Sequence, residues 1–169
     1  MIQKKVCMVG VFGTGKTSLV QQFVQSKFSE KYHSSVGVKI DRKVVDVNGS
    51  AVTIVLWDLA GRDEHEDVGA SYLRGAHGVI YVADGTRKET CEQIADLRRV
   101  ATAAAGPVPG LIALNKCDLV GDWKLSQADE EALRANGPVF RTSAKSGQGV
   151  EQMFLAMARV LVAPTQGAR

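Results

Sequence analysis

The sequence is poor in cysteine and histidine and has no long apolar run. Its 169 residues include three cysteines without a CxxC pair and three dispersed histidines. No stretch approaches the ~18 consecutive apolar residues that are needed to cross a bilayer. Disulfide frameworks and zinc sites need more thiols or closely spaced imidazoles. We therefore expect a cytoplasmic protein with no disulfide, no His/Cys metal site and no transmembrane segment.

The sequence also lacks recognisable lipidation signals and runs of basic residues. It has no glycine at position 2 for myristoylation, and its last residues, APTQGAR, have no cysteine for prenylation. The 21 lysines and arginines are interspersed with 18 acidic residues, whereas nucleic-acid binders cluster their basic residues. We expect a monomer with no nucleic-acid partner and no lipidation motif.

Short apolar runs alternate with longer segments of helical periodicity. The apolar runs are 6–9, 51–57, 79–83, 111–114 and 139–140, and the helical segments are 16–26, 66–74, 88–105, 126–135 and 148–162. This alternation is typical of βα units around a buried parallel sheet. Asn48-Gly49 separates two strand-like runs and predicts a tight hairpin, so one edge strand should be antiparallel. We expect one α/β domain over 1–163, with a six-stranded, mostly parallel sheet, helices on both faces and a short tail at 164–169.

The last helical segment carries a methionine-rich stripe. Met153, Phe154, Met157 and Val160 recur at helical spacing on one face. A methionine stripe can mark a promiscuous binding surface. An apolar stripe is more typical of the side of a helix that packs on the core, and we expect that position here.

The segment GVFGTGKT (10–17) follows the first apolar run and fits the pattern G-x-x-x-x-G-K-[ST]. Its glycines let the backbone turn tightly, so that successive N–H groups point at an anion, and the helix N-terminus adds partial positive charge. Lys16 can reach the β- and γ-phosphates, and the Thr17 hydroxyl can bind Mg²⁺. The motif predicts the phosphate loop of a P-loop NTPase domain, and the alternative is an ordinary glycine-rich turn.

Two later motifs indicate which base accompanies the phosphates. NKCD (115–118) follows the apolar run 111–114, and TSAK (142–145) follows 139–140. Both should therefore lie at the carboxyl edge of the sheet, where doubly wound proteins bind ligands. A carboxylate at Asp118 can accept two N–H donors from guanine, which adenine does not offer. The motifs favour GTP or GDP.

Together, GVFGTGKT, DLAG (58–61), NKCD and SAK resemble the small GTPases of the Ras superfamily, and the Rab branch most closely. The resemblance extends from Lys4 to about Leu161. It implies a switch that binds GTP or GDP with Mg²⁺ and hydrolyses GTP slowly. It also implies a set of nucleotide-binding residues: Gly13, Thr14, Gly15, Lys16, Thr17, Ser18, Phe28, Asn115, Lys116, Asp118, Ser143, Ala144 and Lys145.

The resemblance assigns roles to the residues near the base. Asn115 should tie the loops together, Lys116 should cover the ring face, and Asp118 should read the base. The SAK segment should contact the guanine from the remaining side. Phe28, in SKFSEKY, should lean against the guanine, although an aromatic residue at a helix end is also typical of a core position.

The resemblance further implies metal binding and a sensor of the γ-phosphate. Thr17 and Ser35 should coordinate Mg²⁺, and Asp58 should hold it through a water. Ser35 stands where the family carries threonine, so it keeps the hydroxyl but loses a methyl group, and we expect a less firmly held switch. The Gly61 amide should meet the γ-phosphate, and Gly61 and Lys16 are the expected catalytic residues.

Loops that change with the nucleotide are the expected contact regions for partner proteins. In this sequence they correspond to residues of about 30–45 and 60–75. The partners implied are effectors, exchange factors and activating proteins.

Arg62 and Phe12 depart from the family pattern. Arg62 replaces the glutamine that orients the attacking water, and its guanidinium has hydrogen-bond donors only. It could stabilise charge on the phosphate or pair with acidic neighbours at the surface. Phe12 could hinder an arginine finger or pack against the first helix or the second switch. We expect slow hydrolysis, with a hydrolysis-deficient, GTP-bound docking module as the alternative. Asp118 and SAK disfavour an ATP-using P-loop enzyme.

Overall fold

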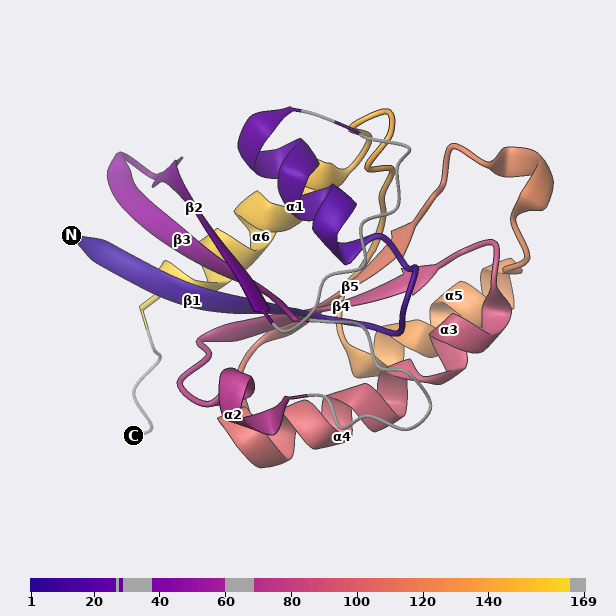
Figure 1. Ribbon diagram of the computed structural model, residues 1–169, viewed down its shortest axis with the longest axis horizontal. Helices are drawn as coiled ribbons and strands as arrows, with labels where there is room; N and C mark the ends of the chain where they lie inside the picture. The colour runs from indigo at the N-terminus through magenta and orange to yellow at the C-terminus, as the bar shows by residue number, and fades with distance from the viewer. Residues whose placement is uncertain (27, 29–37, 60–68, 165–169) are drawn as a thin grey trace.

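Six strands form a single sheet through the centre of the molecule (Figure 1). The computed structural model describes residues 1–26, 28, 38–59 and 69–164. The strands are β1 (Ile2–Val9), β2 (Val38–Val47), β3 (Ser50–Leu59), β4 (Gly78–Asp84), β5 (Gly110–Asn115) and β6 (Val139–Arg141). They lie side by side in the order β2-β3-β1-β4-β5-β6. The predicted six-stranded α/β architecture is confirmed.

The one antiparallel pair in this sheet is the hairpin at its edge. Strand β2 runs antiparallel to β3, and the other neighbouring strands are parallel. Asn48 and Gly49 connect the two strands with positive φ angles of 53° and 83°, as a type I′ turn requires. The Gly49 N–H donates to the Asp46 carboxylate at 3.0 Å and holds the turn. The hairpin predicted from the sequence is confirmed.

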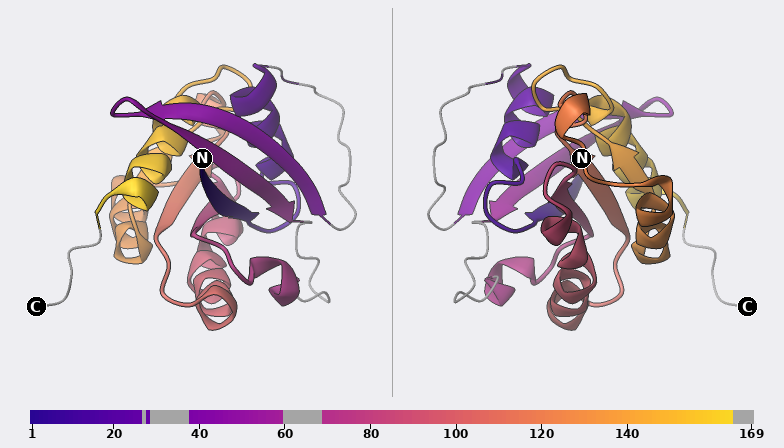
Figure 2. Two further views of the ribbon diagram at one scale, coloured as in Figure 1. Left: turned by 90° about the vertical axis from the view of Figure 1, so that its left-hand side faces the viewer. Right: turned by 90° about the vertical axis from the view of Figure 1, so that its right-hand side faces the viewer.

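Helices cover both faces of the sheet (Figures 1 and 2). Helices α1 and α6 pack on one face, and α2 to α5 lie on the other. None of the helices in the described ranges is long and apolar enough to cross a membrane. The helices are α1 (Lys16–Gln25), α2 (Ala70–Leu73), α3 (Lys88–Glu92), α4 (Ile94–Ala105), α5 (Gln127–Leu133) and α6 (Val150–Val162), with short 3₁₀ turns at η1 (Val120–Asp122) and η2 (Arg134–Asn136).

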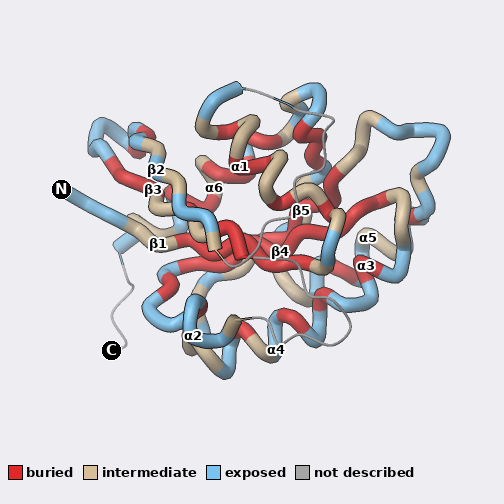
Figure 3. Tube along the Cα trace, in the orientation of Figure 1, coloured by how far each residue is buried: buried red, intermediate tan, exposed pale blue. Residues whose placement is uncertain are grey.

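Each face of the sheet buries its own hydrophobic cluster. The buried residues concentrate along the central strands (Figure 3). Alternate residues of a strand point to opposite faces. In β1, Val6 and Met8 join the cluster beneath α1 and α6, whereas Cys7 and Val9 join the cluster beneath α4. Strand β4 is buried along its whole length. A strand that is covered on both faces reads as a continuous apolar run, which is the pattern in the sequence.

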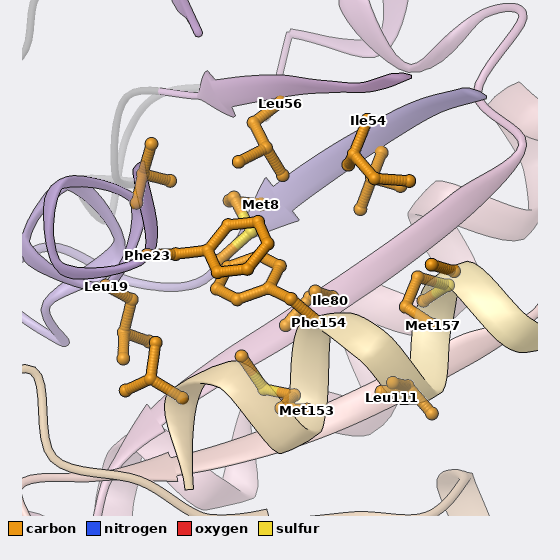
Figure 4. Packing of buried hydrophobic residues seen from close by; sticks show 14 of the residues in the cluster. Met8, Leu19, Phe23, Ile54, Leu56, Ile80, Leu111, Met153, Phe154 and Met157 are labelled. Carbon is orange, nitrogen blue, oxygen red and sulfur yellow. The ribbon is translucent and has the colours of Figure 1, made fainter. Parts of the chain in front are cut away.

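Helix α6 is held against α1 by stacked aromatic rings (Figure 4). The ring centroids of Phe23 and Phe154 lie 4.2 Å apart. Met153 and Met157 are buried beside them, so the methionine stripe is a core face, as expected. Val160 was expected on the same face but is 48% exposed. This assignment was wrong because the face of α6 that packs on the cluster continues through Leu161 and Val162, so Val160 falls at its edge.

Two element boundaries differ from the sequence-based expectations. The segment 88–105 was expected to form one helix, but it is interrupted at Gln93, whose N–H bonds the carbonyl of Cys91 instead of continuing the helical ladder. Strand β1 begins at Ile2, four residues before the apolar run. Polar residues extend it because pairing with β3 satisfies the backbone whatever the side chain, and Gln3 lies opposite Thr53.

Candidate nucleotide-binding site

Buried polar residues gather where the parallel strands end. Asp58 lies near the end of β3, Asp84 ends β4, Asn115 ends β5, and Thr142 follows β6. All four are at most 2% exposed. The glycine-rich loop at 10–15 leaves β1 at the same edge. Because doubly wound sheets bind ligands at the carboxyl ends of their strands, this edge is the candidate site.

The glycine-rich loop needs its glycines for two physical reasons. Gly13 and Gly15 have φ angles of 78° and 99°, in the left-handed region that side chains rarely adopt. The loop is also packed closely against its neighbours. A Cβ on Gly15 would lie 2.3 Å from Asn115 Nδ2, and a Cβ on Gly10 would lie 2.4 Å from the Val82 carbonyl. The sequence motif therefore forms a tightly wound loop that leads directly into α1.

Lys16 reaches back into this loop. Its ammonium donates to the carbonyls of Gly10 at 3.0 Å and Val11 at 3.4 Å, and the residue is 6% exposed. Burial lowers the pKa of Lys16 to about 8, and the nearby Asp58 carboxylate opposes that shift. A phosphate bound in the loop would add negative charge beside the ammonium and favour its protonated form.

Thr17 and Asp58 form a compact set of oxygen donors beside Lys16. The Thr17 hydroxyl donates to Asp58 Oδ2. The other carboxylate oxygen, Oδ1, is buried and has no hydrogen-bond partner within the described part of the chain. Burial raises the pKa of Asp58, whereas the Thr17 hydroxyl and Lys16 oppose the increase. A hydroxyl and one carboxylate suit Mg²⁺, which takes few protein ligands and completes its shell with water and phosphate oxygens.

Asn115 joins three segments of the site. Its amide nitrogen donates to the Thr14 carbonyl at 3.0 Å. Its amide oxygen accepts from the Thr142 hydroxyl at 3.2 Å and from the Ala144 N–H at 3.3 Å. Both ends of one short side chain are therefore used to hold the phosphate loop against the loop after β6. Ala144 is itself 4% exposed, so this junction is closed to solvent.

The loop after β6 also orients Asp118. The Ser143 hydroxyl, which is fully buried, donates to Asp118 Oδ1 at 2.8 Å. The same hydroxyl accepts the Ser146 N–H at 2.9 Å. The Cys117 N–H donates to the Thr142 carbonyl at 3.0 Å and links the two loops through their backbones. Asp118 is half-buried, and the bond from Ser143 holds its carboxylate in position.

The remaining described candidates are half-buried or exposed. Phe28 follows α1 and is 40% exposed, so it does not occupy a core position. Its contact with the base remains a prediction. Phe12 is 53% exposed at the tip of the phosphate loop. Ser18 is half-buried in the first turn of α1, and Lys145 is exposed.

Ser35, Gly61 and Arg62 lie outside the described residues. The same holds for 30–37 and 60–68 within the two regions that are expected to contact partner proteins. The roles assigned to these residues remain predictions.

Sequence reasoning did not single out Asp84, which is the most densely bonded carboxylate at this edge. One of its oxygens accepts from the Thr86 N–H and hydroxyl at 2.9 and 2.6 Å. The other lies 2.8 Å from the Lys116 ammonium and 3.1 Å from Arg87 Nε. Burial raises the pKa of Asp84, but the bonds from Lys116 and Thr86 outweigh it and lower the pKa overall. The signal was a charged residue directly after the apolar run 79–83.

The fold and this site define a P-loop nucleotide-binding protein with a doubly wound sheet. Comparison with known families gives the next level of detail. The family model described as the Ras family matches residues 5–163. The chain therefore belongs to the Ras family. Family membership supports a GTP-binding switch in general.

Individual relatives agree with this assignment. The chain is 32% identical over 168 residues to the Ras-related protein Rab-13 of Bos taurus, covering 98% of this chain and 83% of the relative. It is 35% identical over 159 residues to the Ras-related protein Rab-1A of Dictyostelium discoideum, with 91% and 78% covered. It is also 35% identical over 159 residues to the GTP-binding protein ypt1 of Schizosaccharomyces pombe, with 92% and 78% covered.

Proposed function

We propose that the protein is a Rab-like molecular switch that binds GTP and GDP with Mg²⁺ and hydrolyses GTP slowly. The observation that carries this proposal is the double use of Asn115, which ties the phosphate loop to the loop after β6. The junction brings the phosphate loop and the NKCD and TSAK segments to one place, as a ligand with a base and a phosphate tail requires.

Guanine selectivity follows from Asp118. Its carboxylate accepts the two N–H donors on the guanine edge, and Ser143 holds it in position at 2.8 Å. A site built on such hydrogen bonds rejects an analogue that lacks them by about 10⁴-fold or more, because its own polar groups are then left unpaired. Lys116 and Phe28 supply faces for the ring, and Ala144 closes the remaining side.

The phosphates are held by the loop that begins α1. The backbone N–H groups from Gly13 to Ser18 surround the phosphate oxygens, and the Lys16 ammonium exchanges its carbonyl partners for phosphate oxygens. Thr17 and Asp58 would hold Mg²⁺, and Ser35 would be a further ligand in the GTP-bound state. The ion, when bound, neutralises charge on the phosphates.

Slow hydrolysis is proposed from the chemistry of Arg62. Water attack requires a group that both donates to and accepts from the water, and a guanidinium can only donate. Arg62 can stabilise charge on the γ-phosphate, but it cannot take over the positioning of the nucleophile. Lys16 and the Gly61 N–H contribute stabilisation of charge, which supports a residual rate.

We place the nucleotide-binding domain at 1–163 and the short tail at 164–169. The described cysteines are free thiols, two of them buried, which is typical of a reducing compartment and supports a cytoplasmic location. Effectors, exchange factors and activating proteins would bind a monomer through residues of about 30–45 and 60–75, since these segments match the family's loops that change with the nucleotide.

A GTP-bound docking module is the second candidate, and the position of Phe12 favours it. Its ring is 53% exposed at the tip of the phosphate loop, where an activating protein would insert an arginine. Together with Arg62, a bulky residue at this point disfavours both intrinsic and assisted hydrolysis. In this case the protein would present a long-lived GTP-bound surface.

A single-turnover assay distinguishes the two. The purified protein is loaded with GTP and Mg²⁺, and bound GTP and GDP are followed over a day beside an Arg62→Gln variant. Slow conversion in the wild type supports the switch, whereas persistent GTP in the wild type with hydrolysis by the variant supports the docking module. Competition with ATP serves as the specificity control, and displacement of GTP by equimolar ATP would contradict guanine binding.

A further inference from the structure

Asp84 lies between the NKCD segment (115–118) and the phosphate loop, and none of the family motifs assigns it a role. It is 1% exposed at the end of β4. One carboxylate oxygen contacts two cations, the Lys116 ammonium at 2.8 Å and Arg87 Nε at 3.1 Å. The shared oxygen ties both side chains to one buried point, at a cost in their conformational entropy.

The first of these cations is the lysine that is proposed to cover the guanine ring. Lys116 has a φ of 68°, an uncommon angle for a residue with a side chain. Such backbone strain persists only where the surroundings over-determine it, and it clusters at functional sites. The ion pair with Asp84 fixes the far end of a side chain that otherwise has many rotamers. The aliphatic stem of Lys116 is thereby kept in one orientation before any nucleotide arrives.

The second cation, Arg87, connects Asp84 to the phosphate loop. Arg87 bonds Asp84 through Nε, and its Nη2 donates to the Phe12 carbonyl at 3.0 Å. The peptide between Phe12 and Gly13 is trans and planar, so its carbonyl and its N–H point in opposite directions. Holding the carbonyl towards Arg87 therefore holds the Gly13 N–H on the side of the peptide opposite Arg87.

We infer that Asp84 and Arg87 are positioning residues for the nucleotide: Asp84 aligns Lys116 with the base, and Arg87, braced by Asp84, orients the Phe12–Gly13 peptide so that its N–H faces the phosphates. This inference rests on the proposed function. It adds a link between the two halves of the site that does not pass through Asn115. Removal of either residue should speed nucleotide release without unfolding the protein.

The test is a double-mutant cycle on the release of fluorescently labelled GDP. Asp84→Asn should raise the release rate about tenfold or more, because the bond between Lys116 and a charged carboxylate contributes enough free energy to change a rate by that factor. Arg87→Gln should raise it severalfold. The double variant should release GDP less than twofold faster than Asp84→Asn alone, since Arg87 without its carboxylate is already loose. Multiplicative effects would instead mean that Arg87 acts independently of Asp84.

The chain offers a matched control in Asp96 and Arg99, which form another pair at the same i, i+3 spacing, at 2.8 Å on the exposed side of α4. Asp96→Asn and Arg99→Gln should leave GDP release within twofold of wild type. If Asp84→Asn fails to fold, Arg87→Gln alone tests the inference. The Arg87 side chain is 39% exposed, and without it the buried Asp84 carboxylate keeps its ion pair with Lys116. Thermal unfolding of each nucleotide-free variant reports on the fold separately.

Two failures are distinguishable in this experiment. Wild-type protein that does not retain labelled GDP would overturn the proposed function and this inference with it. Wild-type protein that retains GDP, with Arg87→Gln releasing it at the wild-type rate or with multiplicative effects in the cycle, would overturn the positioning role alone.

Discussion

The amide nitrogen of Asn115 lies 3.0 Å from the carbonyl oxygen of Thr14, although 101 residues separate them in the chain. The bond is buried, and the opposite end of the same amide binds the loop after β6. One side chain thus sets the distance between the part of the site that holds phosphates and the part that holds the base.

Asn115→Ala should loosen both loops at once. Buried donors and acceptors left without partners cost about 1–3 kcal/mol, so we expect a loss of that size in the free energy of unfolding. We also expect GDP release at least about tenfold faster, since each 1.4 kcal/mol is a factor of ten. Urea denaturation and labelled-GDP release measure the two effects. Asn136→Ala in η2, away from the site, is the control, and equal behaviour of the two variants would contradict the linking role.

Gly15→Ala should abolish nucleotide binding. The substitution places a methyl group 2.3 Å from the Asn115 amide nitrogen at a φ of 99°, so either the loop or Asn115 must move. Gly121→Ala is the matched control, because its added methyl group meets nothing within 4 Å. Calorimetric titration with GDP should show heat for Gly121→Ala and none for Gly15→Ala. Wild-type affinity in Gly15→Ala would mean that the packed loop is not the phosphate site.

Phe154→Ala should be among the most destabilising single changes in α6. The ring is 1% exposed and stacks on Phe23, so its removal leaves a cavity in the cluster beneath α1 and α6. We expect a loss of about 3–5 kcal/mol in the free energy of unfolding, measured by urea denaturation at fixed GDP concentration. Val160→Ala, at a 48% exposed position of the same helix, should change it by less than about 0.5 kcal/mol. Comparable losses in both variants would contradict this packing.

Thiol reactivity should separate the three cysteines by burial. Burial raises the pKa of Cys7 and of Cys91 to about 11, and it also raises the pKa of half-buried Cys117. The thiolate is the reactive form, so at pH 8 a thiol reagent should modify Cys117 first and the other two only after unfolding. A folded Cys117→Ser variant should then show no fast phase of thiol modification. Mass spectrometry that finds Cys7 labelled in the folded protein would contradict the prediction.

The same pKa shifts predict a loss of stability at alkaline pH. A thiol whose pKa is higher in the folded state binds its proton more tightly there, so its contribution to stability is fully present below the unfolded pKa near 9. The contribution is lost as pH rises through the folded value of about 11. Thermal unfolding between pH 9 and 11 should therefore show a falling midpoint, and a Cys91→Ala variant should show a shallower fall. A midpoint that stays level above pH 9 would contradict this assignment.

Much of the fold was readable from local pattern. The hairpin at Asn48-Gly49, the alternation of strands and helices along the chain, and the buried face of α6 at Met153 and Met157 all follow from turn chemistry and hydrophobic period. The errors fall at element ends. Val160 continued the period in the sequence but falls at the edge of the packed face, which continues through Leu161 and Val162. Local periodicity does not fix which of several neighbouring apolar residues in the last turn faces the core.

The candidate site divides in the same way. The phosphate loop is a local structure, because its glycines and the start of α1 lie within eight residues, and so the sequence by itself determined it. The network of Asp84, Lys116 and Arg87 was decided by tertiary structure, since the Phe12 carbonyl that Arg87 reaches lies 75 residues away in the chain. Such contacts depend on which strand ends become neighbours. Strand order is set by the packing of the whole sheet, and for that reason only the folded chain revealed them.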